Sequence, residues 1–166
     1  MKILLILFCV FVNFNIYSQE NQFFSDRGHL SIQIDGYGFR IALVPNLADA
    51  IYSWDNPDEN NNSPINIITS VRRGSAIAVF LIFAAAENNV NLTYKFKTLK
   101  PDGTFTENID LIIHNGVTDR NRYMYARQLP TIIYYNYDPI GIYQYHLEIY
   151  DSNKYLCKAI MEFQVQ

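Results

Sequence analysis

The chain has few cysteines, and their positions exclude a fold held by disulfides. Its 166 residues contain 2 cysteines, and Cys9 lies in the apolar start of the chain, so Cys157 is alone in the part that we expect to fold. One cysteine cannot form an intramolecular disulfide, so stability must come from the core. Cys157 is in phase with the apolar residues Met161, Phe163 and Val165. We therefore expect a buried thiol that packs as a small hydrophobe, rather than a reactive one.

The chain also has no excess of positive charge. Its formal net charge is −3 at pH 7. Proteins that bind nucleic acid usually carry a basic stripe, and attachment to anionic lipid depends on basic clusters. The composition therefore argues against nucleic-acid binding and against attachment to anionic lipid. We expect no nucleic-acid partner.

The one long apolar segment at the start of the chain is too short to be a membrane span. Lys2 precedes an apolar run from Ile3 to Val12, and Asn13 to Ser18 is more polar. A transmembrane helix needs about 20 apolar residues, whereas a basic start, a short apolar run and a small residue at the exit are typical of an export signal. We expect a signal peptide over residues 1–18, a single domain over 19–166, no membrane segment after cleavage, and a periplasmic or secreted protein.

The histidines do not form a recognisable metal site. His29, His114 and His146 are far apart in the sequence, and none has a partner at a ligand spacing. His146 falls on the polar side of an alternating strand, so we expect it to face solvent. The sequence predicts no metal ligand.

No catalytic motif is present either. Ser75 follows a glycine but lacks the Gly-x-Ser-x-Gly elbow that exposes a nucleophile. Asp55, Asp58 and Glu59 lack the alternating ligands and the glycine of a calcium loop. We therefore expect no catalytic residue and no cofactor, and we interpret the chain as a protein that is not an enzyme.

The patterns that are present predict β-structure. From Tyr143 to Ile149, apolar and polar residues alternate with the period of a half-buried strand. Pro101-Asp102-Gly103 is a strong turn signal, and Ala76 to Ala86 is an apolar run suited to a strand buried on both faces. Eight to ten such short segments, with turns about every ten residues, predict an all-β antiparallel sandwich. Leu47 to Trp54 fits either a short helix or a strand.

These landmarks resemble a family of uncharacterised exported bacterial proteins with an immunoglobulin-like domain. The shared features are Trp54 before a proline-bearing loop, Val71-Arg72-Arg73-Gly74, Leu99-Lys100-Pro101-Asp102-Gly103 and Asp138-Pro139-Ile140-Gly141-Ile142-Tyr143, the last followed by Asp151 and by Phe163-Gln164-Val165. The resemblance implies an exported immunoglobulin-like β-sandwich. It implies no activity and no functional residues.

Two segments are candidates for a binding surface. Most of the 13 tyrosines lie between Tyr123 and Tyr155. Neighbours on a strand point to opposite faces, so Tyr134 or Tyr135 should reach the surface, close to Tyr137. Exposed tyrosine is common in binding sites.

The second candidate is the polar loop Asn56 to Pro64, which contains Asp58 and Glu59. We expect an exported binding or structural module that recognises protein or glycan. The alternative is a secreted inhibitor of a periplasmic or extracellular enzyme that acts through this loop. The sequence does not decide between them, nor does it give the oligomeric state.

Overall fold

The computed structural model describes residues 21–55, 65–86, 89–106, 109–117, 124–126, 131–133 and 137–166. Strands account for most of this part, and there is one helix. In chain order the elements are β1 (Gln22–Ser25), β2 (His29–Ile34), β3 (Tyr37–Val44), α1 (Leu47–Asp55), β4 (Ser70–Val71), β5 (Ala76–Ala85), β6 (Asn89–Leu99), β7 (Ile109–Val117), β8 (Met124–Ala126), β9 (Thr131–Ile133), β10 (Gly141–Asp151) and β11 (Lys154–Val165).

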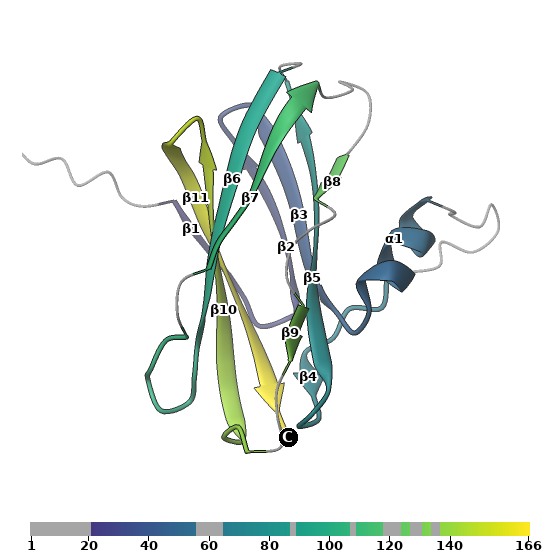
Figure 1. The fold of residues 1–166 in the computed structure, drawn as a ribbon, viewed down its shortest axis with the longest axis vertical. Helices are drawn as coiled ribbons and strands as arrows, with labels where there is room; N and C mark the ends of the chain where they lie inside the picture. Colours follow the sequence, from purple (N-terminus) through teal and green to yellow (C-terminus); the bar gives the residue numbers. More distant parts are fainter. Residues whose placement is uncertain are drawn as a thin grey trace, which may run out of the picture.

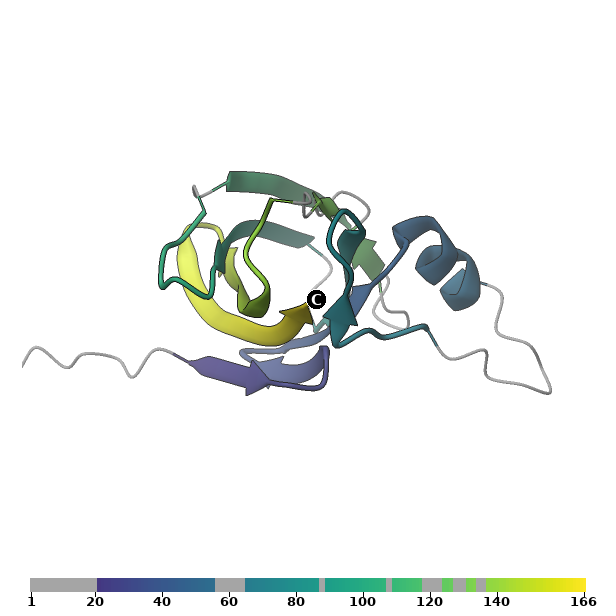
Figure 2. The same ribbon diagram turned by 90° about the horizontal axis from the view of Figure 1, so that it is seen from below.

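The strands form two sheets that face one another (Figure 1). The 6-stranded sheet has the order β1-β11-β10-β6-β7, and β4 also pairs with β11. The 5-stranded sheet has the order β2-β3-β5-β8, and β9 also pairs with β5. Figure 2, viewed from below, shows the sheets curving around a common interior while α1 stands outside. The prediction of an all-β chain with packed sheets is confirmed.

Tight turns set the register of two of the hairpins. Asp35 and Gly36 join β2 to β3 with φ of 47° and 80°, and Ser152 and Asn153 join β10 to β11 with φ of 48° and 71°. Two consecutive residues with positive φ are typical of the hairpin turn whose twist matches that of paired strands. An ion pair of 2.9 Å between Lys154 Nζ and Asp35 Oδ2 links the two turns, so these ends of the two sheets lie together.

The core lies between the sheets, where the inward residues of alternating strands meet. Tyr143 and Phe163, opposite each other on β10 and β11, stack at 5.7 Å between ring centroids. Cys157 is fully buried in the same core, as the sequence predicted. Burial raises the pKa of its thiol to about 12, because a thiolate loses its hydration there.

Strand β5 is buried on both faces, as its apolar run predicts. Its residues Val79, Leu81 and Phe83 face the core between the sheets, and its residues Phe80 and Ile82 face outward. An outward apolar face must be covered by another element, because burying it is the main source of stability.

Helix α1 provides part of that cover, which resolves the ambiguous segment from Leu47 to Trp54. The Oδ1 atom of Asn46 accepts a hydrogen bond from the backbone N–H of Ala48 at 2.9 Å, the arrangement of a helix N-cap. Ala50 and Ile51, one turn along, pack with Phe80 of β5. The helix turns these two side chains toward the apolar outer face of β5. Their burial there favours a helix over a strand for this segment.

Candidate functional site

A buried tyrosine fixes the loop that leads into β10. The hydroxyl of Tyr143 donates a hydrogen bond of 2.7 Å to the carbonyl oxygen of Pro139, and the side chain is fully buried. Gly141 has a φ of 148° and approaches the ring of Pro101 so closely that a Cβ atom would lie 2.9 Å from it. The loop before β10 is therefore held against the hairpin that follows β6.

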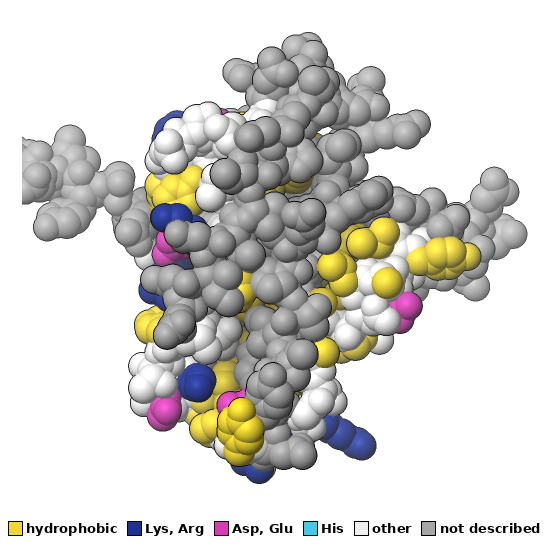
Figure 3. Space-filling model, viewed as in Figure 1, with side chains coloured by type: hydrophobic (Ala, Val, Ile, Leu, Met, Phe, Trp, Pro, Cys, Tyr) yellow, Lys and Arg dark blue, Asp and Glu magenta, His cyan; other side chains and the backbone are white. Residues whose placement is uncertain are grey.

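Four apolar side chains in this loop, at the start of β10 and on the neighbouring hairpin are exposed. Tyr137 is 80% exposed, Ile140 59%, Ile142 56%, and Phe105 on the neighbouring hairpin 46%. We call these four residues the end surface. Figure 3 shows hydrophobic side chains exposed at the lower end of the molecule, close to basic and acidic ones. Single exposed apolar residues are ordinary, whereas a large contiguous apolar patch is typical of an interaction site. The end surface is therefore a candidate.

His146 borders the end surface, and the expectation that it faces solvent is wrong. It is 7% exposed, because the ring of Phe105 lies edge-on to it at 5.2 Å between centroids. The Nζ atom of Lys97 lies over the ring of Phe105, 4.3 Å from its centroid. Burial, and then the positive charges of Lys158 and Lys97, lower the pKa of His146 to about 4.

Further along the strands, the outer face of the same sheet becomes polar and charged. Glu148 accepts a hydrogen bond of 2.8 Å from the hydroxyl of Tyr150 and lies 3.8 Å from the ammonium of Lys158. Lys95 lies over the ring of Tyr150 at 5.1 Å. The apolar end surface therefore has a polar border on the sheet side, as a binding patch typically does.

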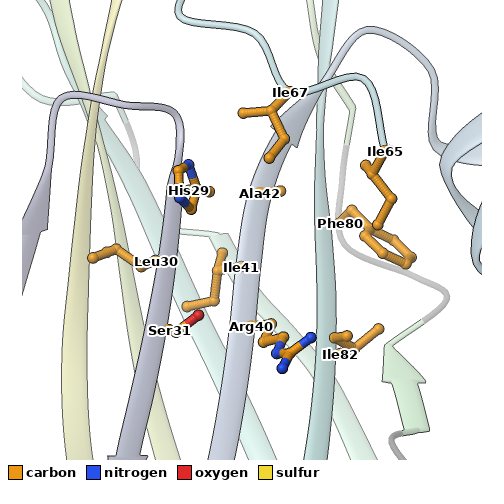
Figure 4. Close-up of a pocket in the computed structure, with 10 residues that line it drawn as sticks. All are labelled: His29, Leu30, Ser31, Arg40, Ile41, Ala42, Ile65, Ile67, Phe80 and Ile82. Atoms are coloured by element: carbon orange, nitrogen blue, oxygen red, sulfur yellow. The ribbon is translucent and has the colours of Figure 1, made fainter. Parts of the chain in front are cut away.

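The opposite face of the molecule has a shallow hollow. It lies over β2, β3 and β5 and has a volume of about 230 Å³. Figure 4 shows its lining, in which most side chains are small or apolar and the charged Arg40 lies at the lower edge. The lining residues are His29, Leu30, Ser31, Arg40, Ile41, Ala42, Ile65, Ile67, Phe80 and Ile82.

The structure describes one of the five residues proposed from the sequence as a binding surface. Tyr137 is highly exposed and belongs to the end surface. Tyr134, Tyr135, Asp58 and Glu59 lie outside the described residues. The hypotheses that concern them, including an inhibitory loop, stay predictions.

Three members of the end surface were not predicted. In the sequence, Ile140 and Ile142 stood out only as parts of the motif from Asp138 to Tyr143, although isoleucines on both sides of a glycine next to a turn could have signalled exposure. Phe105 follows the Pro101-Asp102-Gly103 turn, and nothing local indicates that its ring reaches across to the neighbouring strand.

The described residues include no group of three or more His, Cys, Asp or Glu side chains placed to hold a metal ion. In the same part of the chain, no helix has the length and apolar character needed to cross a membrane. Cys157, the only cysteine among the residues that the structure describes, is buried.

No protein-family model matches the chain, and no curated protein matches it. Among solved structures, the chain is similar to a Pseudomonas fluorescens alkylpurine DNA glycosylase, AlkC, bound to DNA containing an abasic site analog. The two chains are 12% identical, with a TM-score of 0.41, and the match covers 59% of this chain and 28% of the glycosylase chain.

This match runs against two expectations from the sequence. The matched protein is an enzyme and binds DNA, so the expectations that this chain is not an enzyme and that it has no nucleic-acid partner are withdrawn. A TM-score of 0.41 carries no argument about the fold or activity of this chain. Neither catalysis nor DNA binding is inferred from it.

Proposed function

We propose that the protein is an exported binding module with an immunoglobulin-like domain, and that it recognises a protein partner through the end surface. The observation that carries this proposal is the exposure of Tyr137, Ile140, Ile142 and Phe105 at one end of a rigid sandwich. Loops at the ends of a β-sandwich are where such folds usually bind. The anchored loop adds to this, since a preformed surface loses little entropy on binding.

The chemistry of the end surface favours a protein over a glycan. Ile140 and Ile142 have neither a flat ring for stacking on a sugar nor a polar group to bind its hydroxyls. They can bury area against another apolar side chain, which is what the centre of a protein interface contains. Tyr137 combines a large apolar area with a polar tip, and tyrosine is among the residues that contribute most to such interfaces.

Strand order supports the immunoglobulin-like part of the proposal. In such sandwiches the two last strands form a hairpin, and the penultimate strand also pairs with an earlier strand of the same sheet. Here β10 and β11 form the hairpin, and β10 also pairs with β6. A tyrosine near the start of the penultimate strand that bonds to backbone upstream is a further hallmark of the family, and Tyr143 on β10 has this geometry.

Export rests on the first residues of the sequence. Lys2, the apolar run that follows it and the small residue Ser18 fit a cleavable signal. Amino-terminal sequencing of the protein recovered from the periplasm or the medium tests this part. We expect a chain that begins close to Gln19, and a recovered chain that still begins at Met1 would show that no cleavage occurs.

The binding proposal is tested by comparing variants in the capture of a partner from periplasmic extract. The triple variant Tyr137→Ser, Ile140→Ser and Ile142→Ser removes most of the end surface without touching the core. A matched control, Phe24→Ser with Tyr52→Ser, removes two aromatic rings that are 56% and 71% exposed elsewhere.

We expect the wild type and the control to retain the same protein and the triple variant to lose it. All three should melt within a few degrees of one another, because surface substitutions change stability by about 0.5 kcal/mol. Equal retention by the triple variant would refute the end surface as the binding site.

A further inference from the structure

The hollow on the outer face of β2, β3 and β5 results from a small residue between two rings. In the paired strands, His29 lies opposite Ala42, and Ala42 lies opposite Phe80. Adjacent strands are about 4.8 Å apart, so the two ring-bearing residues stand roughly 10 Å apart with only a methyl group between them. Figure 4 shows this row of three.

The ring of His29 is fixed at one side of the hollow. Its Nδ1 atom lies 3.1 Å from the carbonyl oxygen of Arg27. A carbonyl oxygen can only accept, so Nδ1 donates the proton of this hydrogen bond. The backbone therefore restrains the orientation of the imidazole, and this side of the hollow is preformed.

The segment that crosses above the hollow is fixed as well. The N–H of Ile68 donates a hydrogen bond of 3.0 Å to the carbonyl of Leu43 on β3. Ile65 and Ile67 belong to this segment and form the upper wall. The walls on both sides therefore belong to hydrogen-bonded elements, which lowers the entropic cost of binding.

One row down, the lining changes from apolar to polar. Ser31 lies opposite Arg40, and Arg40 lies opposite Ile82. Arg40 is exposed, and its guanidinium is the only charged group among the residues that line the hollow. Figure 4 shows this guanidinium turned toward Ile82. A guanidinium can bind both oxygens of a carboxylate.

The volume limits the size of the apolar part. An apolar cavity of about 150 Å³ holds a benzene ring, and whole drug-sized ligands occupy roughly 300–1,000 Å³. At about 230 Å³ the hollow has room for one ring or branched alkyl group together with a carboxylate.

We propose that this hollow binds an apolar carboxylate, with its ring or branched chain over Ala42, between His29 and Phe80, and its carboxylate on Arg40. The ligand is either a small free acid or the carboxyl-terminal residue of a peptide, since the two have the same chemistry. This site is separate from the end surface, so the two proposals can fail independently.

The test is an NMR titration of the isotope-labelled protein, expressed from the full-length chain, with sodium phenylacetate. A ligand of this size binds weakly, so additions to about 20 mM are needed. We expect amide shifts to change together for Ala42, Arg40 and Ile67. The neutral analogue 2-phenylethanol has the same ring without the charge, and it should bind at least roughly tenfold more weakly.

Two variants localise the binding. Arg40→Gln keeps much of the side-chain stem and removes the charge, and we expect roughly a tenfold loss of phenylacetate affinity. Ala42→Val fills the floor and should abolish binding. Arg73→Gln, at an exposed arginine in the turn before β5, is the matched control and should bind as the wild type does. Melting temperatures establish that each variant is folded.

An acetylated peptide that ends in a free phenylalanine distinguishes the two sources. Binding of phenylacetate but not of the peptide identifies a free acid, and tighter binding of the peptide identifies a peptide carboxyl terminus. The absence of shifts with both probes would overturn the proposal. So would unchanged affinity in the folded Arg40→Gln variant, or equal binding of 2-phenylethanol.

Discussion

The hydroxyl of Tyr143 donates a hydrogen bond of 2.7 Å to the carbonyl oxygen of Pro139, four residues earlier in the chain. The aromatic ring meanwhile stacks on Phe163 in the core between the sheets. One side chain thus joins the core to the loop before β10, which contains Ile140 and lies beside Ile142 of the end surface. Burial, and then the negative charges of Asp138 and Asp102, raise the pKa of this hydroxyl, so it remains a donor at neutral pH.

The two functions of Tyr143 can be separated by substitution. Tyr143→Phe removes only the hydrogen bond and should lower the free energy of unfolding by about 1 kcal/mol. Tyr143→Ala also removes the ring from the core and should cost about 3 kcal/mol or more. Urea denaturation measures both. Equal and negligible losses would show that Tyr143 does not act as a buried anchor.

Gly28 and Gly103 form a matched pair for a second prediction. Both have positive φ, 70° and 82°, but a Cβ atom at Gly28 would overlap the carbonyl oxygen of Ile68, whereas a Cβ at Gly103 would meet nothing within 4 Å. Gly103→Ala should therefore cost only the conformational strain, about 1 kcal/mol. Gly28→Ala must also displace backbone and should cost at least about 2 kcal/mol more.

Thermal or urea denaturation of the two variants checks this difference. The result also concerns the hollow, because Ile67 lies next to Ile68 in the segment that would move. If both alanine variants are equally stable, the segment above the hollow is not held as tightly as its contact with Gly28 requires.

Alternation along single strands predicted most of the fold correctly. Leu92, Tyr94 and Phe96 on β6 face the core, as their spacing of two indicates. Period-two patterns are reliable here because one face of each strand is buried by the other sheet. The turn at Pro101-Asp102-Gly103 was also predictable, since Asp102 Oδ1 accepts the backbone N–H of Thr104 at 2.8 Å, a local interaction.

The features that sequence did not predict depend on contacts across strands. His146 occupies one of the alternating polar positions of β10. It is nevertheless buried, because Phe105, about forty residues earlier in the chain, covers it. The hollow depends on two registers, one that sets Ala42 beside His29 and one that sets it beside Phe80. The turn at Asp35-Gly36 sets the first, but no local pattern indicates the second, because β3 and β5 are not consecutive in the chain. The sequence indicated that β5 is covered on both faces, but it did not decide that a helix provides part of the cover.

Cys157 should be chemically silent in the folded protein. Its side chain is fully buried, and burial raises the pKa of the thiol to about 12, so little of the reactive thiolate forms near neutral pH. A thiol-reactive chromophore at pH 8 should show no reaction until denaturant is added. The denatured protein should then release one equivalent if Cys9 has been removed by processing, and two if it has not. Rapid labelling of the native protein would contradict the burial of Cys157.

Folding stability should fall in mildly acidic solution because of His146. Its pKa is about 4 in the folded protein, against 6.5 for an ordinary histidine. Between these values the unfolded chain binds a proton that the folded protein does not, so falling pH stabilises the unfolded state. Above pH 6.5 the imidazole is neutral in both states, and the full stability is present. From pH 7 to pH 4.5 this one group should remove about 2 kcal/mol.

The surroundings of His146 indicate which variants test its contribution. Lys97 and Lys158 disfavour its charged form from the strands on either side, Glu148 on its own strand favours that form, and the ring of Phe105 excludes water. In urea denaturation at pH 7 and pH 4.5, His146→Gln should lose about 2 kcal/mol less than the wild type between the two pH values. Phe105→Ser admits water to the imidazole, so it should raise the pKa of His146 toward the ordinary value and weaken the pH dependence. An identical pH dependence in the wild type and in folded His146→Gln would show that the buried imidazole is not the group that titrates.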